Sequence, residues 1–278
     1  GRALTAGELM AQIRRLAGGL TERGILPGGT VAILAPNMPE YPVVFHAVAW
    51  GGGTVTTINP TYTAPEIHHQ LVDAGAVMLV TIPAFAEVAR EAAEGTDIRD
   101  IVIIGSETCL SLEDVMGQPL EAQVPVDLES HVVVLPYSSG TTGRPKGVML
   151  THRNLVANVQ QSGAVAGITE KDTAIAFLPF FHIYGMTVMM NLFLERRAKL
   201  VTMPRFELEL FLRLIQDHRA TRLYIVPPVA LALAKHPMVS EFDMSSVVEV
   251  FSGAAPLGPE TEIAVGERLG ALSVQGYG

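Results

Sequence analysis

The feature that most constrains this chain is the alternation of continuous apolar runs with capped helical segments. Thr5 and Glu8 have the spacing of a capping box, which predicts a helix start because the pair can satisfy two otherwise unpaired backbone N–H groups. Thr63 and Glu66 repeat the pattern. The intervening runs of Val, Ile and Leu lack polar alternation, which is typical of parallel strands covered by helices on both faces. The sequence therefore predicts an α/β fold.

The expected elements are numerous enough for two sheets. Prolines and carboxylates gather between Gly105 and Ser130, which indicates a connection between two halves. We therefore expect a first α/β subdomain over residues 1–130 and a second over residues 131–278. Helices are expected near 5–24, 40–50, 63–75 and 207–218, and strands at 31–34, 55–58, 77–80, 101–104, 132–135, 148–150, 198–202, 222–226 and 247–251.

Composition narrows the class of protein. The net charge of −9 argues against a nucleic-acid partner, and 49% hydrophobic with 17% charged residues excludes a disordered chain. The longest uncharged runs, 41–65 and 173–194, are interrupted by glycine and proline, so we expect no transmembrane segment. Cys109 is the only cysteine, which fits a reducing compartment, and we expect the cytoplasm. The sequence begins with Gly1 rather than Met, and we expect both ends to be cut.

One segment has the composition of a phosphate site. Residues 137–147 combine hydroxyl side chains and glycines with Arg144 and Lys146. Glycines let backbone N–H groups approach an anion, hydroxyls donate to phosphate oxygens, and lysine adds a point charge. The segment is not a Walker A loop, because Lys146 is followed by Gly147 rather than by Ser or Thr. The alternative is a polar hairpin loop between two strands.

This segment closely resembles the phosphate-binding signature of the adenylate-forming (AMP-binding) superfamily of acyl-CoA synthetases, luciferases and peptide-synthetase adenylation domains. Three more segments occur in the family's order: LPFFHIYG at 178–185, SGAAPL at 252–257 and QGYG at 275–278. With VPP at 226–228 and residues 232–235, they are most similar to the 4-coumarate:CoA ligase branch and related medium-chain and aryl acyl-CoA synthetases. The resemblance covers essentially the whole chain. It implies the large N-terminal domain of these enzymes, with two mostly parallel sheets and without the C-terminal domain.

The resemblance assigns ATP binding to three segments. The hydroxyl-rich loop would hold the β- and γ-phosphates, the turn at 253–256 would line the adenine and acyl pockets, and Tyr277 would stack on the adenine. Standing alone, Tyr277 would be interpreted as an aromatic residue at a strand end. The implied ATP-binding residues are Ser138, Ser139, Gly140, Thr141, Thr142, Gly143, Lys146, Gly253, Ala254, Ala255, Pro256, Gln275, Gly276, Tyr277 and Gly278.

The resemblance also implies an acyl pocket. His182 would gate the tunnel for the acyl carboxylate, although a lone histidine in an apolar run is otherwise typical of a core residue. Arg205 lies where these ligases carry a basic residue facing CoA, and the alternative is a solvated cation before a helix. The implied acid-binding residues are His182, Tyr184, Val188, Phe251 and Ala254, and the implied catalytic residues are Lys146, Thr141, Thr142 and His182.

The implied reaction is attack of a carboxylate on the α-phosphorus of ATP with release of pyrophosphate, followed by transfer of the acyl group to the CoA thiol. Carboxylate and triphosphate repel one another, so catalysis would depend on positioning and charge neutralisation, and Mg²⁺ is expected with ATP. No pattern in the sequence has the spacing of metal ligands from the protein. Family members are longer and carry the adenylation lysine in a C-terminal domain, so we expect this chain alone to be inactive.

Phe251 bears on which acid is bound. Plant hydroxycinnamate ligases carry at this position a lysine that reaches the phenolic hydroxyl. A buried hydroxyl without a partner costs about 1–3 kcal/mol, so Phe251 and Val188 are expected to favour cinnamate or medium-chain fatty acids. Two other functions stay open: a luciferase-like or peptide-synthetase-type adenylating enzyme, and a non-catalytic nucleotide- or acyl-binding module.

Overall fold

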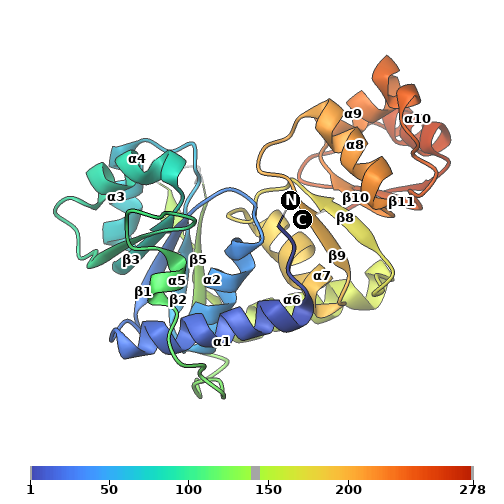
Figure 1. Cartoon of the computed structure of the whole chain (residues 1–278). Coiled ribbons are helices and arrows are strands. Elements are labelled where there is room, and N and C mark those ends of the chain that lie inside the picture. Colours follow the sequence, from blue (N-terminus) through green and yellow to red (C-terminus); the bar gives the residue numbers. More distant parts are fainter. Residues whose placement is uncertain (1, 139–144, 277–278) are drawn as a thin grey trace. The chain divides into compact units, whose positions relative to one another are not determined.

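The computed structural model describes residues 2–138 and 145–276, and the chain divides into two compact units, Gly1–Asn158 and Val159–Gly278. Each unit contains a mostly parallel sheet with helices packed on it (Figure 1). The predicted α/β class and the two sheets are therefore confirmed. Within the described ranges, none of the helices combines the length and the apolar character that a membrane crossing needs.

The sheet of the first unit is parallel except at one end. Within the described residues it has seven strands, in the order β4-β3-β1-β2-β5-β6, with β7 also paired to β5. Strands β6 and β7 run antiparallel to β5. The elements are α1 (Ala6–Glu22), β1 (Thr30–Leu34), α2 (Glu40–Trp50), β2 (Thr54–Thr57), α3 (Ala64–Asp73), β3 (Ala76–Thr81), the 3₁₀ turn η1 (Pro83–Phe85), α4 (Ala86–Ala93), β4 (Asp100–Ile103), α5 (Leu112–Val115), β5 (Val132–Ser138), β6 (Lys146–Gly147), β7 (Leu150–Thr151) and α6 (His152–Ala166).

The sheet of the second unit is parallel throughout its described strands, in the order β12-β11-β10-β8-β9. An unusual element, the π-helix η2, follows β8. The elements are β8 (Thr173–Ala176), η2 (Gly185–Leu192), α7 (Phe193–Glu195), β9 (Lys199–Thr202), α8 (Leu208–His218), β10 (Arg222–Ile225), α9 (Pro227–Lys235), the 3₁₀ turn η3 (Pro237–Glu241), β11 (Glu249–Ser252), α10 (Pro259–Leu269) and β12 (Leu272–Gln275).

The capping boxes form as predicted. The Thr5 hydroxyl accepts from the Glu8 N–H at 3.2 Å, and the Glu8 carboxylate accepts from the Thr5 N–H at 2.7 Å. Thr63 and Glu66 make the same reciprocal contacts at the start of α3. Both helices therefore begin where the sequence places them, because the first-turn donors are satisfied locally.

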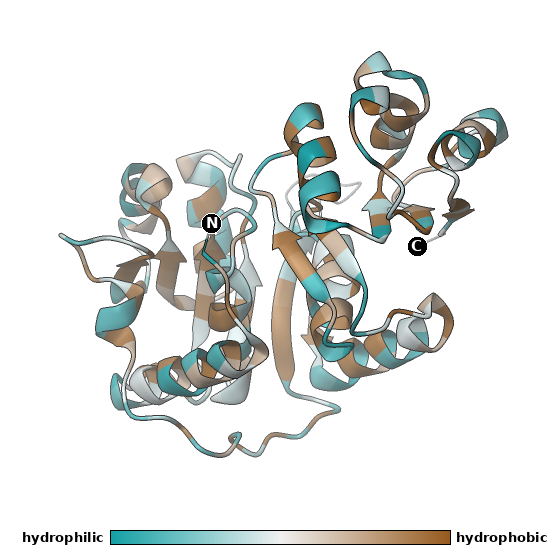
Figure 2. Cartoon of the chain, turned by 45° about the vertical axis from the view of Figure 1, so that its right-hand side comes forward, coloured by the Kyte–Doolittle hydropathy of each residue, from teal (hydrophilic) through white to brown (hydrophobic). Residues whose placement is uncertain are grey.

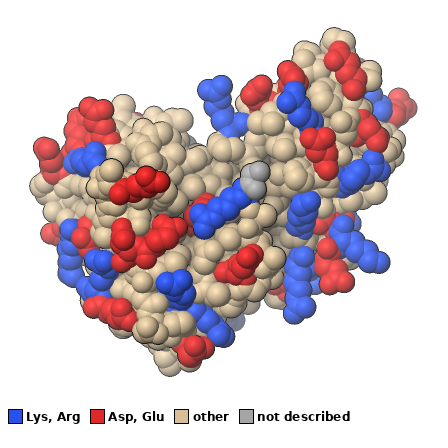
Figure 3. Space-filling model, viewed as in Figure 1, with Lys and Arg blue, Asp and Glu red and all other residues tan. Residues whose placement is uncertain are grey.

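The strands are buried between helices, as their continuous apolar character predicts. In β1 every residue from Val31 to Leu34 is fully buried. On one face of that sheet, β1 packs against Ile67 and Leu71 of α3 and Ala89 of α4. Figure 2 shows the same arrangement, with hydrophobic strands and helices that carry hydrophilic outer faces. On the face shown in Figure 3, charged side chains of both signs are interspersed.

The structure differs from the expected boundary and from some expected strands. Strand β5 pairs in parallel with β2 (Val55 with Val134), so the first sheet continues past residue 130. The first compact unit ends at Asn158 along the chain. The strand expected at 148–150 is divided into β6 and β7, with Val148 and Met149 exposed between them. Strand β8 is not predicted, because its residues lie inside a long uncharged run, where a buried strand and a buried helix have the same apolar pattern.

Candidate functional site

The hydroxyl-rich segment begins and ends on a short antiparallel ladder in the first unit. Ser138 of β5 pairs with Lys146 of β6, and both residues are exposed. Folding therefore brings together a hydroxyl and a cation from the two sides of the segment. This ladder fits both the phosphate loop and the polar hairpin that the sequence allows. The other residues predicted here lie outside the described residues: Ser139, Gly140, Thr141, Thr142 and Gly143.

In the second unit, the chain between β8 and η2 turns tightly around Gly185. The His182 N–H donates to the Pro179 carbonyl at 3.1 Å, and the Met186 N–H donates to the His182 carbonyl at 2.9 Å. A Cβ atom at Gly185 would lie 2.1 Å from the Pro179 carbonyl oxygen, so a side chain does not fit there. The turn places His182 and Tyr184 directly before a π-helix, an element that is frequent at functional sites.

His182 as a whole residue is exposed, so it is not a core residue. Its Nδ1 accepts a hydrogen bond from the Tyr184 N–H at 3.3 Å. Partial burial lowers the pKa of His182 below its usual value, which favours the neutral ring at pH 7. A neutral ring that accepts at Nδ1 carries its proton on Nε2. His182 can therefore donate a hydrogen bond to an anion without being charged.

Tyr184 lies against the carboxyl end of β11. A Cβ atom at Gly253 would be 3.1 Å from the Tyr184 ring, so the ring rests on a backbone that has no side chain. The Tyr184 hydroxyl is buried and has no hydrogen-bond partner among the described residues. Burial raises the pKa of this hydroxyl, which keeps it protonated. A buried donor without a partner is a site where a ligand acceptor would be stabilised.

Phe251 forms an aromatic wall with Tyr224 on the same sheet. The two residues are opposite each other on β11 and β10, and their ring centroids are 5.2 Å apart. A Cβ atom at Gly276 would be 2.1 Å from the Phe251 Cζ, so the ring extends over the backbone that follows β12. The half-buried Phe251 side chain thus presents a fully apolar surface at the carboxyl ends of the strands.

The turn at 253–256 is held in one shape. The Gly253 N–H donates to the Ile225 carbonyl at 3.1 Å, and Ala254 has a φ of +70°, a left-handed conformation that is unusual for a residue with a Cβ. Ala254, Ala255 and Pro256 are exposed, so their small side chains leave the backbone accessible. Ligands of parallel α/β sheets bind beyond the carboxyl ends of the strands, which is where this turn lies.

Gln275 braces that turn. Its side-chain oxygen accepts from the Leu257 N–H at 2.9 Å, and its amide donates to the Glu262 carboxylate in the first turns of α10. Both polar ends of Gln275 are therefore engaged with the protein, which is the role of a support. Gly276 follows, with its N–H donating to the Ser252 carbonyl at 2.9 Å. Tyr277 and Gly278 lie outside the described residues.

Two predicted residues make no defining contact. Arg205 is exposed in the turn between β9 and α8, and it has no hydrogen bond or ion pair with the described residues. This position suits both a CoA-facing cation and a solvated arginine. Val188 is half-buried on the π-helix η2.

The sequence-based prediction misses two residues that shape the second-unit site, Tyr224 and Glu262, and includes Leu257 only as the last residue of the motif at 252–257. Tyr224 stacks on Phe251 only because β10 and β11 are neighbours, which no local pattern in the sequence specifies. Leu257 and Glu262 contact Gln275 from the following loop and helix. The available signal was the glutamate near the start of a helix that follows Pro259.

The second unit presents both hydrogen-bonding groups and apolar aromatic rings beyond its parallel strands. The neutral His182 donor, the unpartnered Tyr184 hydroxyl and the glycine backbones under two aromatic rings all belong to the second unit. The described ranges contain no group of three or more His, Cys, Asp or Glu side chains that could hold a metal ion by themselves, whereas Mg²⁺ in nucleotide sites is held largely by phosphate oxygens and water.

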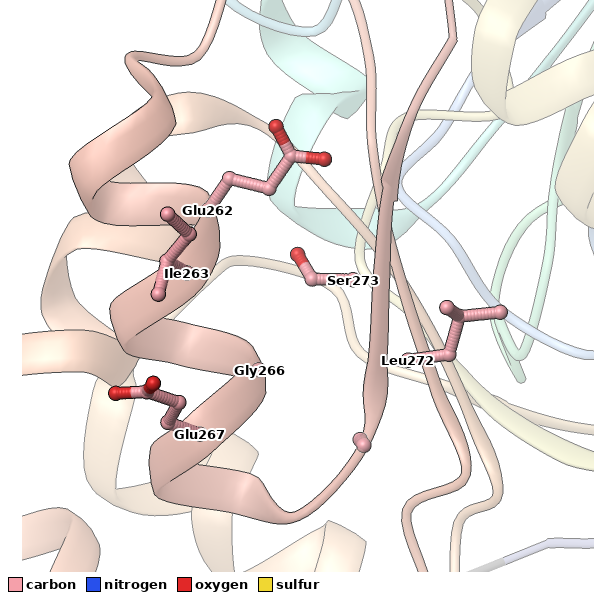
Figure 4. Close-up of a pocket in the computed structure, with 7 residues that line it drawn as sticks. Glu262, Ile263, Gly266, Glu267, Leu272 and Ser273 are labelled. Atoms are coloured by element: carbon pink, nitrogen blue, oxygen red, sulfur yellow. The ribbon is translucent and has the colours of Figure 1, made fainter.

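An open hollow of about 460 Å³ lies between α10 and β12. Figure 4 shows Glu262 and Ser273 extending toward the space between helix and strand. The lining residues are Glu262, Ile263, Gly266, Glu267, Ala271, Leu272 and Ser273, and none of them belongs to the predicted site.

Comparison with known proteins finds CoA ligases as relatives and as structural neighbours of this chain. 4-Coumarate–CoA ligase 5 of Oryza sativa subsp. japonica is 37% identical over 100% of this chain and 52% of the relative. A long-chain-fatty-acid-CoA ligase from Archaeoglobus fulgidus matches with a TM-score of 0.90 at 29% identity, over 97% of this chain and 55% of that chain. An anthranilate CoA ligase in complex with anthranoyl-AMP matches with a TM-score of 0.91 at 25% identity, over 98% and 54%.

The chain spans about half the length of the curated relatives it matches. The model of the family described as "AMP-binding enzyme" matches residues 1–278. The chain therefore belongs to the AMP-binding enzyme family.

Proposed function

We propose that this chain is the nucleotide- and acid-binding part of an acid–CoA ligase that forms an acyl-adenylate from ATP and transfers the acyl group to CoA. The observation that carries the proposal is the second-unit site, where a neutral His182 donor and the unpartnered Tyr184 hydroxyl accompany an apolar aromatic wall. An acid with an apolar body and a carboxylate head needs these two kinds of surface. The similarity to a ligase that holds anthranoyl-AMP supports the same chemistry.

The protein's contribution to the first step would be charge management. A carboxylate and a triphosphate repel, so the reacting groups must be oriented and their charge neutralised by the site. Lys146 supplies a cation and Ser138 a hydroxyl donor at the base of the hairpin. His182 would hold the acid carboxylate by a hydrogen bond from its Nε2–H. Because the ring is neutral, it would leave the carboxylate ionised and able to attack. Mg²⁺, when bound with ATP, would supply further neutralisation of phosphate charge.

The acid class follows from Phe251. Its ring is packed on Tyr224 and over Gly276, and the Phe251 side chain itself has no donor for a phenolic hydroxyl. We therefore assign cinnamate-like or medium-chain aliphatic acids as the preferred substrates. Arg205 is assigned to the CoA phosphates, because it is an exposed cation with no partner among the described residues.

The test is acid-dependent exchange of radiolabelled pyrophosphate into ATP by the protein that the gene encodes. The acids are cinnamate, 4-coumarate, benzoate, octanoate and palmitate, and the 278-residue chain is assayed in parallel. We expect exchange with cinnamate or octanoate, and CoA-dependent thioester formation with the same acids. Exchange without thioester formation would instead support an adenylating enzyme that uses another acceptor. No exchange with any acid would contradict the proposal.

Lys146 provides the matched site test. Lys146→Ala should lower the exchange rate, since it removes the cation at the base of the hairpin. Lys171→Ala is the control, because Lys171 is an exposed lysine of the second unit outside the site. Equal rates for the two variants would remove Lys146 from the proposed machinery.

A further inference from the structure

Tyr137 connects the base of the hydroxyl-rich hairpin to a helix. Tyr137 directly precedes Ser138 on β5, and its hydroxyl donates to the Asp73 carboxylate at 2.5 Å. The ring lies over Gly147 of β6, where a Cβ atom would be 3.1 Å from the ring carbons. One side chain therefore covers the opposite strand of the ladder and bonds to α3. The contact links the hairpin to an element that comes much earlier in the chain.

Asp73 is placed against the local rule for helices. It is the last residue of α3, where the negative end of the helix dipole disfavours a carboxylate. The last turn of α3 contains no basic residue to offset that charge. The acidic residue is thus not explained by helix stability, whereas the Tyr137 hydroxyl gives it a partner.

Helix α3 is a firm support for such a contact. Ile67 and Leu71 are buried in the core of the first unit. The buried Gln70 amide donates to the Thr56 hydroxyl at 2.9 Å and to the Thr57 carbonyl at 3.0 Å, both on β2. Side chains that position a site work best when they are held by rigid elements. The hairpin, by contrast, depends on β6, a strand of only two residues.

We propose that Asp73 is a positioning residue that holds the Ser138–Lys146 base of the hairpin through the Tyr137 hydroxyl. The role of the hairpin in binding polyphosphate rests on the proposed function, whereas the anchoring itself does not. Burial of the Tyr137 ring, together with the Asp73 carboxylate, raises the pKa of the hydroxyl, so it remains a donor at neutral pH.

The anchoring is tested by amide hydrogen exchange of the 278-residue chain. The reporter is the Val148 N–H, which donates to the Pro136 carbonyl across the ladder at 2.9 Å. Asp73→Ala and Tyr137→Phe should each accelerate its exchange by roughly five- to tenfold while the amides of β1 and β3 keep their protection. Asp73→Asn should restore slow exchange, because the amide oxygen still accepts from the hydroxyl. Asp97→Ala, which removes another exposed carboxylate of this unit, is the control.

Unchanged Val148 exchange in both Asp73→Ala and Tyr137→Phe would overturn the proposal. Equal acceleration throughout the first unit would also overturn it, since that is the signature of general stabilisation. The consequence for ligands is measured by calorimetric titration of the gene-encoded protein with tripolyphosphate. The anchor variants should bind about five- to tenfold more weakly than the parent and the control. Faster exchange with unchanged affinity would overturn the positioning role, whereas absence of binding by the parent would contradict the proposed function and leave the exchange result to decide the anchoring.

Discussion

Two aromatic side chains of the second-unit site rest on glycine backbones. The rings can lie there only because these two residues have no Cβ atom. Tyr184 lies on Gly253 at a distance that leaves no room for a Cβ without a shift of the ring. Phe251 extends even closer over Gly276. These glycines belong to the motifs at 252–257 and 275–278, but the reason for glycine at each position is visible only when the partner rings are placed.

Gly253→Ala should displace the Tyr184 ring by a few tenths of an ångström. We expect the KM for the acid to rise by about three- to tenfold, because the displaced ring would move the Tyr184 hydroxyl away from its ligand. A tenfold change corresponds to about 1.4 kcal/mol of binding free energy. The measurement is pyrophosphate exchange at varied acid concentration. Gly258→Ala is the control, since a Cβ at Gly258 would meet no atom within 4 Å. Identical KM values for both variants would show that the ring position does not matter.

Phe251→Lys tests the assignment of the acid. A lysine there would supply a donor that the Phe251 ring lacks, so the ratio of kcat/KM for 4-coumarate to that for cinnamate should rise by about tenfold, within the roughly 1–3 kcal/mol of one buried hydrogen bond. Phe251→Met removes the ring without adding a charge and serves as the control. The ratio of the two kcat/KM values is the quantity to compare, because Phe251→Lys and Phe251→Met both lose the ring that packs on Tyr224. A ratio that rises equally in both variants would contradict the role of the charge.

At the scale of elements, local signals in the sequence located helices better than they located strands. The capping boxes at Thr5 and Thr63 form as predicted because their donors and acceptors are close in sequence. The strand expected at 148–150 is divided instead, since β6 and β7 are fixed by pairing with β5. The π-helix η2 was outside the reach of sequence patterns, because its apolar residues carry no signal for the wider turn.

Gly185→Ala should destabilise the turn before η2. The added Cβ would contact the backbone carbonyl oxygens of Pro179 and Leu178, which cannot rotate away as a side chain can. We expect a loss of about 1–3 kcal/mol in the free energy of unfolding, the usual cost of overpacking. The check is denaturant unfolding followed by circular dichroism, with Gly258→Ala again as the reference. A loss no larger than that of the reference would contradict the argument.

At the scale of the whole molecule, the sequence predicted the number and type of sheets but not where one ends. The strand β5 has the same apolar character as strands of either sheet, and only its pairing with β2 assigns it to the first. The site residues of the second unit were predicted through the motif resemblance, while Tyr224 and Glu262 depend on long-range neighbours. The ATP-binding roles assigned to residues within 139–144 and 277–278 stay predictions, because these residues lie outside the described ranges.

A largely buried network of ion pairs and hydrogen bonds around Arg222 joins several elements of the second unit. Arg222 of β10 bonds to Asp172 at 3.2 Å and to Glu249 of β11 at 2.8 Å. Its guanidinium also donates to the carbonyl of Gly167, which follows α6. The Asp172 carboxylate accepts from the Thr169 N–H and the Thr221 hydroxyl, both at 2.8 Å.

This network predicts how the stability of the second unit depends on pH. Burial alone would raise the pKa of Asp172, but the hydrogen bonds and Arg222 outweigh it and hold the pKa below the usual 3.8. The unfolded chain therefore binds this proton more readily, so the contribution is complete above pH 3.8 and is lost as the pH falls through the lowered pKa. Asp172→Asn should cost about 1–3 kcal/mol at pH 7, and the difference from the parent should shrink below pH 3.8. Guanidinium unfolding between pH 7 and pH 3 is the check, with the exposed Asp217→Asn as control, and a difference that stays constant across this range would contradict the assignment.

The braced turn after β11 has a consequence for how ligands bind. Hydrogen bonds fix it at Gly253 and at Leu257, and Ala254 already occupies a conformation that a mobile loop would rarely visit. The loop's conformational entropy is thus lost during folding rather than on association. The binding surface is therefore already formed before a ligand arrives. The free energy gained from contacts with this turn is not reduced by a cost of ordering its backbone on binding.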